Sequence, residues 1–119
     1  MTFGLLLDEH APAALIGMLT SYDNRLRVQQ VGRSPAPPKS TPDPELLAYG
    51  DANDLCLVTK DKSTMLVHLL ARLDAGLRSA GIALFTRPTD INETAESLRI
   101  MWTCRTDDEV VNQIEYLPY

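Results

Sequence analysis

Apolar and polar residues follow two different periods along this chain, and these periods predict strands and helices in turn. Three segments are apolar at nearly every position, which is typical of strands buried on both faces of a parallel sheet; they are 5–7, 55–59 and 82–85. Between them, apolar residues recur every three or four positions, the period of an amphipathic helix. Segment 25–29 alternates instead, which predicts a half-exposed strand near a sheet edge.

Residues that start and stop helices bound the first two helical segments. The first is predicted to open at Ala11–Pro12 and to end at Asp23–Asn24. The second is predicted to begin with Asp43 as N-cap, to run to about Tyr49 and to stop at Gly50. The proline-rich stretch between segment 25–29 and this helix is predicted to be an exposed loop.

The second half of the chain predicts three further helices. Ser63 is the expected N-cap of a long helix that ends at Gly81, and its expected core face consists of Leu66, Leu69, Leu70, Leu73 and Leu77. Asp90 and Thr106 each precede a glutamate by three residues, the spacing of a capping box, and open the other two. The last of these is expected to include Val110, Val111 and Ile114. Segment 115–119 is left open as a short strand or a tail.

The alternation of strands and helices predicts an α/β fold, a three-layer α/β/α sandwich with a mostly parallel central sheet, formed by one domain over 1–119. Right-handed crossovers and the edge character of 25–29 predict that the first four strands lie in the order 2-1-3-4. The order then reverses between the first and third strands. Asp8 and Asp61 follow these two strands, so both are expected at the edge where parallel sheets bind ligands.

Composition narrows the function classes. The net charge of −5 argues against broad electrostatic binding of nucleic acid, but it does not exclude a nuclease, because metal-binding carboxylates make such sites acidic. No apolar run is long enough to span a membrane, and no signal peptide is recognisable. Cys56 and Cys104 match no metal-binding spacing. The chain is therefore expected to be cytoplasmic and free of disulfides.

A cluster of carboxylates is the candidate chemistry. Asp8, Asp61 and either Asp43 or Glu45 are expected to converge, and Mg²⁺ or Mn²⁺ is the cation that such a cluster suits. One or two such ions can activate water and stabilise charge on a phosphodiester during hydrolysis. Each acid also has a structural interpretation, since Asp8 and Asp61 follow strands as turn or cap residues do, and Asp43 precedes a helix.

Three neighbouring side chains are candidates for contact with a substrate. His10 follows Asp8 closely and is either a ligand or proton shuttle or a surface histidine. Lys60 and Lys62 flank Asp61, where they either meet a phosphate backbone or form a solvated pair.

The blocks that hold these residues resemble a known family, the PIN-like nuclease domains, and in particular a small bacterial branch related to VapC toxins. The similarity lies in 5–12, 43–49 and 58–62, together with the strand from Gly81–Ile82, and it extends over most of the chain. The resemblance implies a sandwich whose acidic rim binds Mg²⁺ or Mn²⁺ and cleaves RNA, often as the toxin of a toxin–antitoxin pair. By position, Asp8 is the first acid, Asp43 or Glu45 the second and Asp61 the third.

The third block departs from the family pattern, which usually continues with a second aspartate and a phenylalanine. Ser63 and Thr64 stand there instead. Asp90 is the better-placed substitute, because Asp54 precedes its strand and belongs at the opposite end of the sheet. Three functions stay open: a metal-dependent ribonuclease, a PIN-like protein-binding module without catalysis, and a phosphatase or receiver-like protein that uses Asp8.

The expected partners follow from these functions. They are an RNA substrate, an antitoxin protein and a second copy of the chain. Three aromatic residues either form the surface for a protein partner or close the core: Trp102, Tyr116 and Tyr119.

Overall fold

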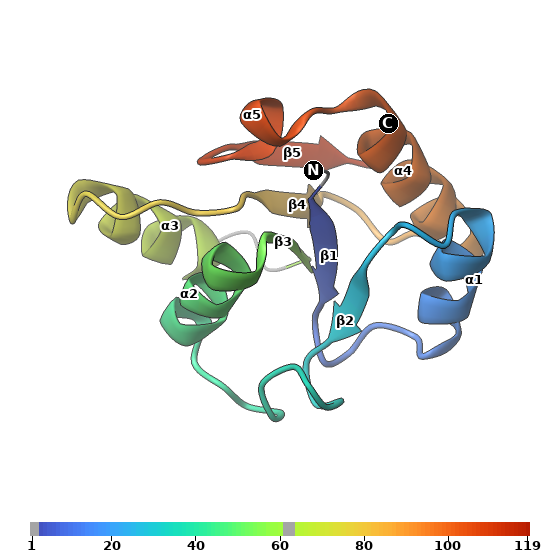
Figure 1. Cartoon of the computed structure of the whole chain (residues 1–119), viewed down its shortest axis with the longest axis horizontal. Coiled ribbons are helices and arrows are strands. Elements are labelled where there is room, and N and C mark those ends of the chain that lie inside the picture. Colours follow the sequence, from blue (N-terminus) through green and yellow to red (C-terminus); the bar gives the residue numbers. More distant parts are fainter. Residues whose placement is uncertain (1–2, 61–63) are drawn as a thin grey trace.

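The computed structural model describes residues 3–60 and 64–119, and it has a central sheet of five parallel strands with helices on both faces (Figure 1). The strands lie in the order β2-β1-β3-β4-β5. This arrangement confirms the predicted α/β fold class and the predicted order of the first four strands. The open C-terminal segment is a fifth strand. The bounds are β1 (Gly4–Leu7), β2 (Val28–Gln30), β3 (Leu55–Thr59), β4 (Ile82–Phe85) and β5 (Ile114–Leu117).

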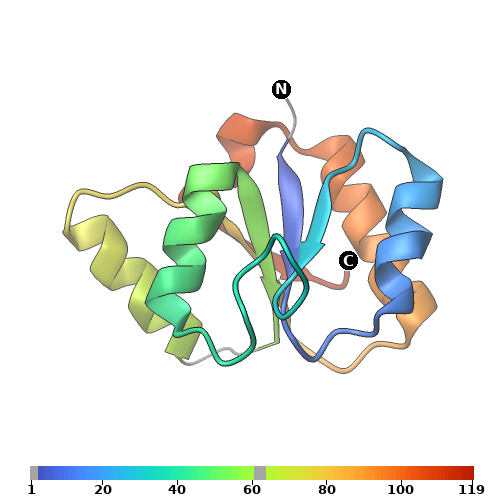
Figure 2. The same ribbon diagram turned by 60° about the horizontal axis from the view of Figure 1, so that its bottom comes forward.

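Two helices cover each face of the sheet (Figure 2). Helices α1 (Ala14–Tyr22) and α4 (Ile91–Cys104) pack against each other and against one face, whereas α2 (Asp43–Asn53) and α3 (Thr64–Asp74) cover the other. The short helix α5 (Asp107–Val110) lies between α4 and β5. Because the strands are parallel, each of the four longer helices begins at the carboxyl edge of the sheet (Figure 2).

The crossover from β4 to β5 has the opposite hand to the crossover from β1 to β2. Both pass over the same face of the sheet, through α4 and α1, although the chain moves toward opposite edges in the two cases. Most parallel crossovers share one hand, so this arrangement needs a physical reason. Strands β3, β4 and β5 carry apolar side chains on that face, such as Val58, Phe85 and Leu117, and α4 buries them together with α1.

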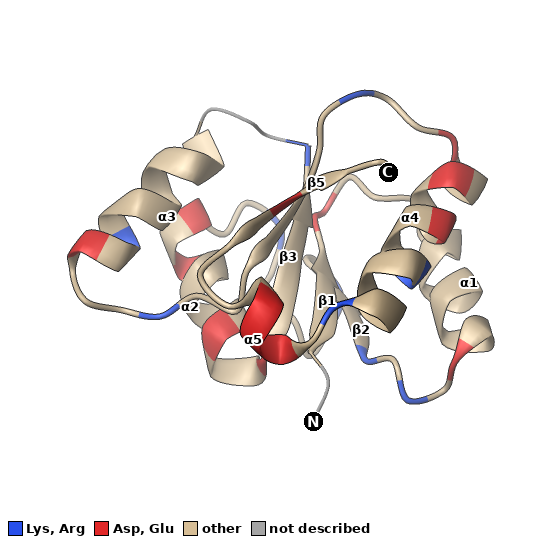
Figure 3. Ribbon diagram, turned by 90° about the horizontal axis from the view of Figure 1, so that it is seen from above, with Lys and Arg blue, Asp and Glu red and all other residues tan. Residues whose placement is uncertain are grey.

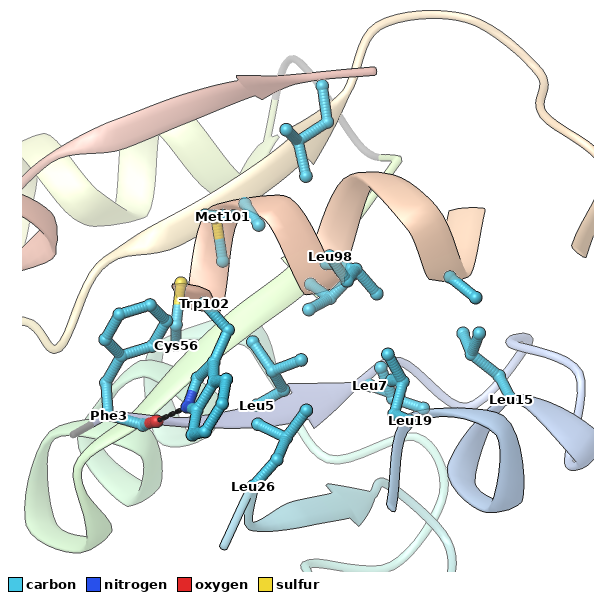
Figure 4. Close-up of a cluster of buried hydrophobic side chains, with 14 of the residues drawn as sticks. Phe3, Leu5, Leu7, Leu15, Leu19, Leu26, Cys56, Leu98, Met101 and Trp102 are labelled. Carbon is cyan, nitrogen blue, oxygen red and sulfur yellow. Dashed lines mark hydrogen bonds between the residues drawn. The ribbon is translucent and has the colours of Figure 1, made fainter. Parts of the chain in front are cut away.

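The core between the sheet and helices α1 and α4 is closed by Trp102 (Figure 4). Its indole Nε1 donates a hydrogen bond to the carbonyl oxygen of Phe3 at 2.9 Å, and only 7% of the residue is exposed. Trp102 is therefore a core residue and not part of a partner surface. Tyr116 and Tyr119 are 58% and 55% exposed, so these two remain available to a partner.

The buried face and the C-terminal end of helix α3 both differ from the prediction. Its buried residues are Met65 and Leu69, whereas Leu70, which the sequence placed in the core, is 52% exposed. Leu66 and Leu77 are exposed as well, and the helix ends at Asp74 rather than at Gly81. The apolar stripe is wider than the contact with the sheet, so part of it has to face solvent. Ser63, the expected N-cap, lies outside the described residues.

Helix α2 also differs from the prediction, at both of its ends. Its N-cap is Pro42, and no side chain, Asp43 included, caps its first turn. The helix continues through Gly50 to Asn53, so Gly50 does not stop it. A Cβ at Gly50 would come within 2.7 Å of the carbonyl oxygen of Leu55, so the missing side chain lets α2 approach β3 closely.

Three smaller boundaries were wrong. Helix α1 begins at Ala14 rather than at Ala11–Pro12, and strand β2 begins at Val28 rather than at Arg25. Helix α5 ends at Val110, so that Ile114 belongs to β5. No helix in the described part of the chain has the length and apolar content needed to cross a bilayer. Both cysteines are free thiols: Cys56 is buried and Cys104 is exposed.

Candidate functional site

The candidate site lies at the carboxyl edge of the sheet, where the strand order reverses. Residues Leu7 of β1 and Val58 of β3 are partners in the ladder, so Asp8 follows β1 at the level of Thr59. This register confirms the prediction that the carboxyl ends of β1 and β3 lie side by side. Asp61 lies outside the described residues, and its meeting with Asp8 stays a prediction.

A pocket of about 90 Å³ opens at this edge, beyond the ends of β1, β3 and β4. It is several times larger than the roughly 10–15 Å³ that a single water requires. Its polar lining includes three residues that were predicted from the sequence as candidate site residues: Asp8, His10 and Lys60. The rest of the lining comes from the connection between β1 and α1, the first turn of α1, the end of β3, the end of β4, the connection that follows β4 and the first turn of α4. These residues are Ala11, Pro12, Leu15, Val58, Thr59, Phe85, Thr89, Ile91 and Thr94.

The backbone at Asp8 is fixed by hydrogen bonds. Its Oδ1 accepts a hydrogen bond from the backbone N–H of His10 at 2.9 Å, which makes a tight turn after the strand. The buried amide of Gln30 donates from Nε2 to the carbonyl oxygens of Asp8 and Ala11, at 3.2 and 2.8 Å. Within the described residues, the second carboxylate oxygen of Asp8 has no hydrogen-bond or ion-pair partner, so it is available to a ligand.

Two side chains that can carry a positive charge, Lys60 and His10, lie in the lining. Lys60 is exposed, and its ammonium pairs with no carboxylate among residues 3–60 and 64–119. His10 is exposed as well. Arg87, by contrast, lies beyond β4 and is held by Glu93, with Nη2 and Oε2 2.6 Å apart. Lys60 therefore supplies a positive charge beside Asp8. Lys62 lies outside the described residues.

The described residues do not by themselves complete a metal site. Asp43 is half-buried and Glu45 is exposed in the first turn of α2, and neither lines the pocket of Asp8. In the described part of the chain, no three side chains of His, Cys, Asp or Glu gather closely enough to hold a metal ion. The fit for Mg²⁺ or Mn²⁺ thus depends on whether Asp61 joins Asp8.

The two acids considered as substitutes have structural roles. Asp90 caps α4, because its Oδ1 accepts from the backbone N–H of Glu93 at 2.8 Å. Asp54 ends α2 at the opposite end of the sheet, as expected, and its Oδ1 lies 2.9 Å from Nη2 of Arg78. Neither residue lines the pocket of Asp8.

Sequence reasoning missed two hydroxyl groups of the site, those of Thr89 and Thr94. They lie where the chain leaves β4 and enters α4, and they hydrogen-bond to each other. The cap signal at Asp90 located the start of α4 at the carboxyl edge, and it was the one available hint that the flanking threonines belong to the site.

Charged residues lie on the helices and on the connections, and the strands are almost free of them (Figure 3). The described strands contain a single charged residue, Glu115 of β5. Its Oε1 lies 2.9 Å from Nε of Arg105. Charged groups of a site at the sheet therefore have to come from the strand ends and helix starts, where Asp8 and Lys60 lie.

No protein-family model, no curated protein and no solved structure matches this chain.

Proposed function

We propose that this protein is a metal-dependent endoribonuclease and that Asp8 is its central acid. One observation supports the proposal above the others: a carboxylate lies at the strand-order reversal, in one pocket with the cation of Lys60, and within the described residues neither is part of an ion pair. Parallel α/β sheets bind ligands at this point. A carboxylate and an ammonium group together suit a phosphodiester substrate, because the carboxylate can bind a metal ion and the ammonium can bind the phosphate.

In this proposal, Asp8 and Asp61 would hold Mg²⁺ or Mn²⁺, and Glu45 or Asp43 would contribute from the start of α2 when RNA is bound. The ion would activate a water and offset the negative charge that develops on the phosphate. Lys60 would hold a phosphate oxygen, and the turn that the His10 N–H and the Gln30 amide stabilise would keep Asp8 oriented. The free thiol of exposed Cys104 suits a cytoplasmic location.

A protein-binding module without catalysis is the second candidate. It is favoured by the absence of a three-ligand group in the part of the chain that the structure describes, and by Ser63 where the resembling family has an acid. The exposed leucines of α3 and the exposed Tyr116 would then contact a protein, such as an antitoxin or a second copy.

Metal binding and RNA cleavage separate the two candidates. We expect Mn²⁺ to bind in calorimetry and to support cleavage of a labelled RNA, and Asp8→Asn to reduce the cleavage rate at least about 100-fold, since even residues behind metal ligands cost up to that much. The side-chain oxygen of the introduced asparagine can still accept the His10 N–H bond, so the fold is retained while the charge is lost.

Asp108→Asn is the matched control, because Asp108 is an exposed acid of α5, at the other end of the sheet. It should leave both metal binding and cleavage unchanged. Absence of Mn²⁺ binding by the wild-type protein would refute the nuclease and leave the binding module. Full activity of Asp8→Asn would refute the role of Asp8.

A further inference from the structure

Apolar side chains from three parts of the fold line the pocket beside Asp8. Pro12 and Leu15 come from the connection into α1 and from its first turn, Phe85 and Ile91 from the end of β4 and the start of α4, and Val58 from β3. Pockets for small ligands combine such apolar side chains with a few polar groups that fix orientation. A planar ring could contact these apolar side chains and leave the groups on its edge for the polar side chains.

On the α4 side, two hydroxyl groups line the pocket and are joined by a hydrogen bond, and the donor in that hydrogen bond can be assigned. The hydroxyl of Thr94 donates its proton to the carbonyl oxygen of Asp90 at 2.8 Å. The hydrogen bond between the two threonines must then be donated by Thr89. Since each hydroxyl has one proton, Thr89 has none left for a ligand. Its oxygen is therefore an acceptor only, and it selects a ligand that donates.

We infer that this pocket receives one base of an RNA strand and that Thr89 selects cytosine or adenine. These two bases carry an amino donor at the ring carbon where uracil and guanine carry a carbonyl oxygen, and that oxygen would meet the Thr89 acceptor without a proton between them. With the ring against the apolar side chains, Asp8 and Lys60 of the same lining would remain for the attached sugar and phosphate. The inference rests on the proposed function, because it assigns a base-specific subsite to the same edge of the sheet.

The pair CMP and UMP tests the inference, since the two differ only in the amino and carbonyl groups of the ring and in the ring nitrogen beside them. Binding is measured by ¹H–¹⁵N NMR titration of the full chain in EDTA, with backbone amide shifts followed at residues 89–94 and at His10 and Ala11. We expect CMP to bind about fivefold or more tightly than UMP, the value of one hydrogen bond. Thr89→Val should abolish the preference, whereas Thr89→Ser, which keeps the hydroxyl, should retain it.

The outcomes for this subsite and for the nuclease are distinguishable, because a mononucleotide has no phosphodiester to cleave and EDTA removes the metal. Equal affinity for CMP and UMP, no binding of either, or a preference that survives Thr89→Val would overturn the subsite even if RNA is cleaved. A preference for CMP without RNA cleavage would support the subsite and refute the nuclease.

Discussion

The orientation of α3 leads to a sharp prediction about two adjacent leucines. Leu69 is 2% exposed and packs against the sheet, whereas Leu70 is 52% exposed, although both belong to the stripe that the sequence assigns to the core. Both residues are leucines of α3, and they lie at nearly the same distance from the ends of the helix. Leu69→Ala and Leu70→Ala therefore differ in burial and in little else.

The expected magnitudes follow from these exposed fractions. Leu69→Ala removes buried atoms and leaves a cavity against β3 and β4, which costs about 2–5 kcal/mol of the free energy of unfolding. Leu70 keeps half of its surface in water even when folded, so the transfer free energy lost by Leu70→Ala is below about 1 kcal/mol. Leucine and alanine are both good helix formers, so propensity contributes little to either value.

Urea denaturation monitored by the fluorescence of Trp102 measures both values, because this single tryptophan is buried and reports on loss of the core. Leu70→Gln is a further control that removes the apolar surface and keeps the side-chain length. Equal destabilisation by Leu69→Ala and Leu70→Ala would refute the orientation of α3. If Leu70→Ala lowers stability only at high protein concentration, the exposed face is buried in an oligomer.

Four further predictions concern other parts of the fold. Gly81→Ala is expected to cost about 1–3 kcal/mol in urea denaturation, because Gly81 has a φ of +101° and a Cβ would collide with the carbonyl oxygen of Val110; a cost near zero would refute this close approach. Burial raises the pKa of the Cys56 thiol from 9.0 to about 12, so at pH 8 a thiol reagent should modify one thiol per folded chain, Cys104, and both after unfolding. The unfolded Cys56 thiol ionises first, so its contribution to stability is complete below pH 9 and is lost as the pH rises toward 12; Cys56→Ala should lessen this decline in denaturation curves. Trp102→Phe leaves the buried Phe3 carbonyl without a donor and should cost about 1–3 kcal/mol by circular dichroism, and unchanged stability would contradict that hydrogen bond.

The three buried strands of this protein, β1, β3 and β4, could be predicted from the sequence. Segments 5–7, 55–59 and 82–85 are apolar at nearly every position, and only a strand covered on both faces can bury such a run. The strand order followed from chain connectivity and from the alternating segment at the edge. The start of α4 was equally readable, because Asp90 caps it through a local hydrogen bond.

The candidate site was predicted only where it depends on chain order. Asp8 lies at the carboxyl end of β1 beside Thr59 and Lys60, as the strand order requires. Asp43 and Glu45 do not line its pocket, since their position depends on how α2 lies on the sheet. The convergence of Asp8 with Asp61 stays a prediction, because Asp61 lies outside the described residues.

By itself, the sequence determined the fold class, the order of the first four strands and the placement of Asp8 at the ligand-binding edge, because these follow from strand burial, helix caps and the order of elements along the chain. Only the tertiary structure decided which leucines of α3 are buried, that α4 lies on the α1 face, and that Thr89 and Thr94 join the pocket. Periodicity defines an apolar stripe, but the contact area offered by neighbouring elements decides how a helix is rotated on the sheet. Side chains from distant segments meet at the pocket only after that packing is complete.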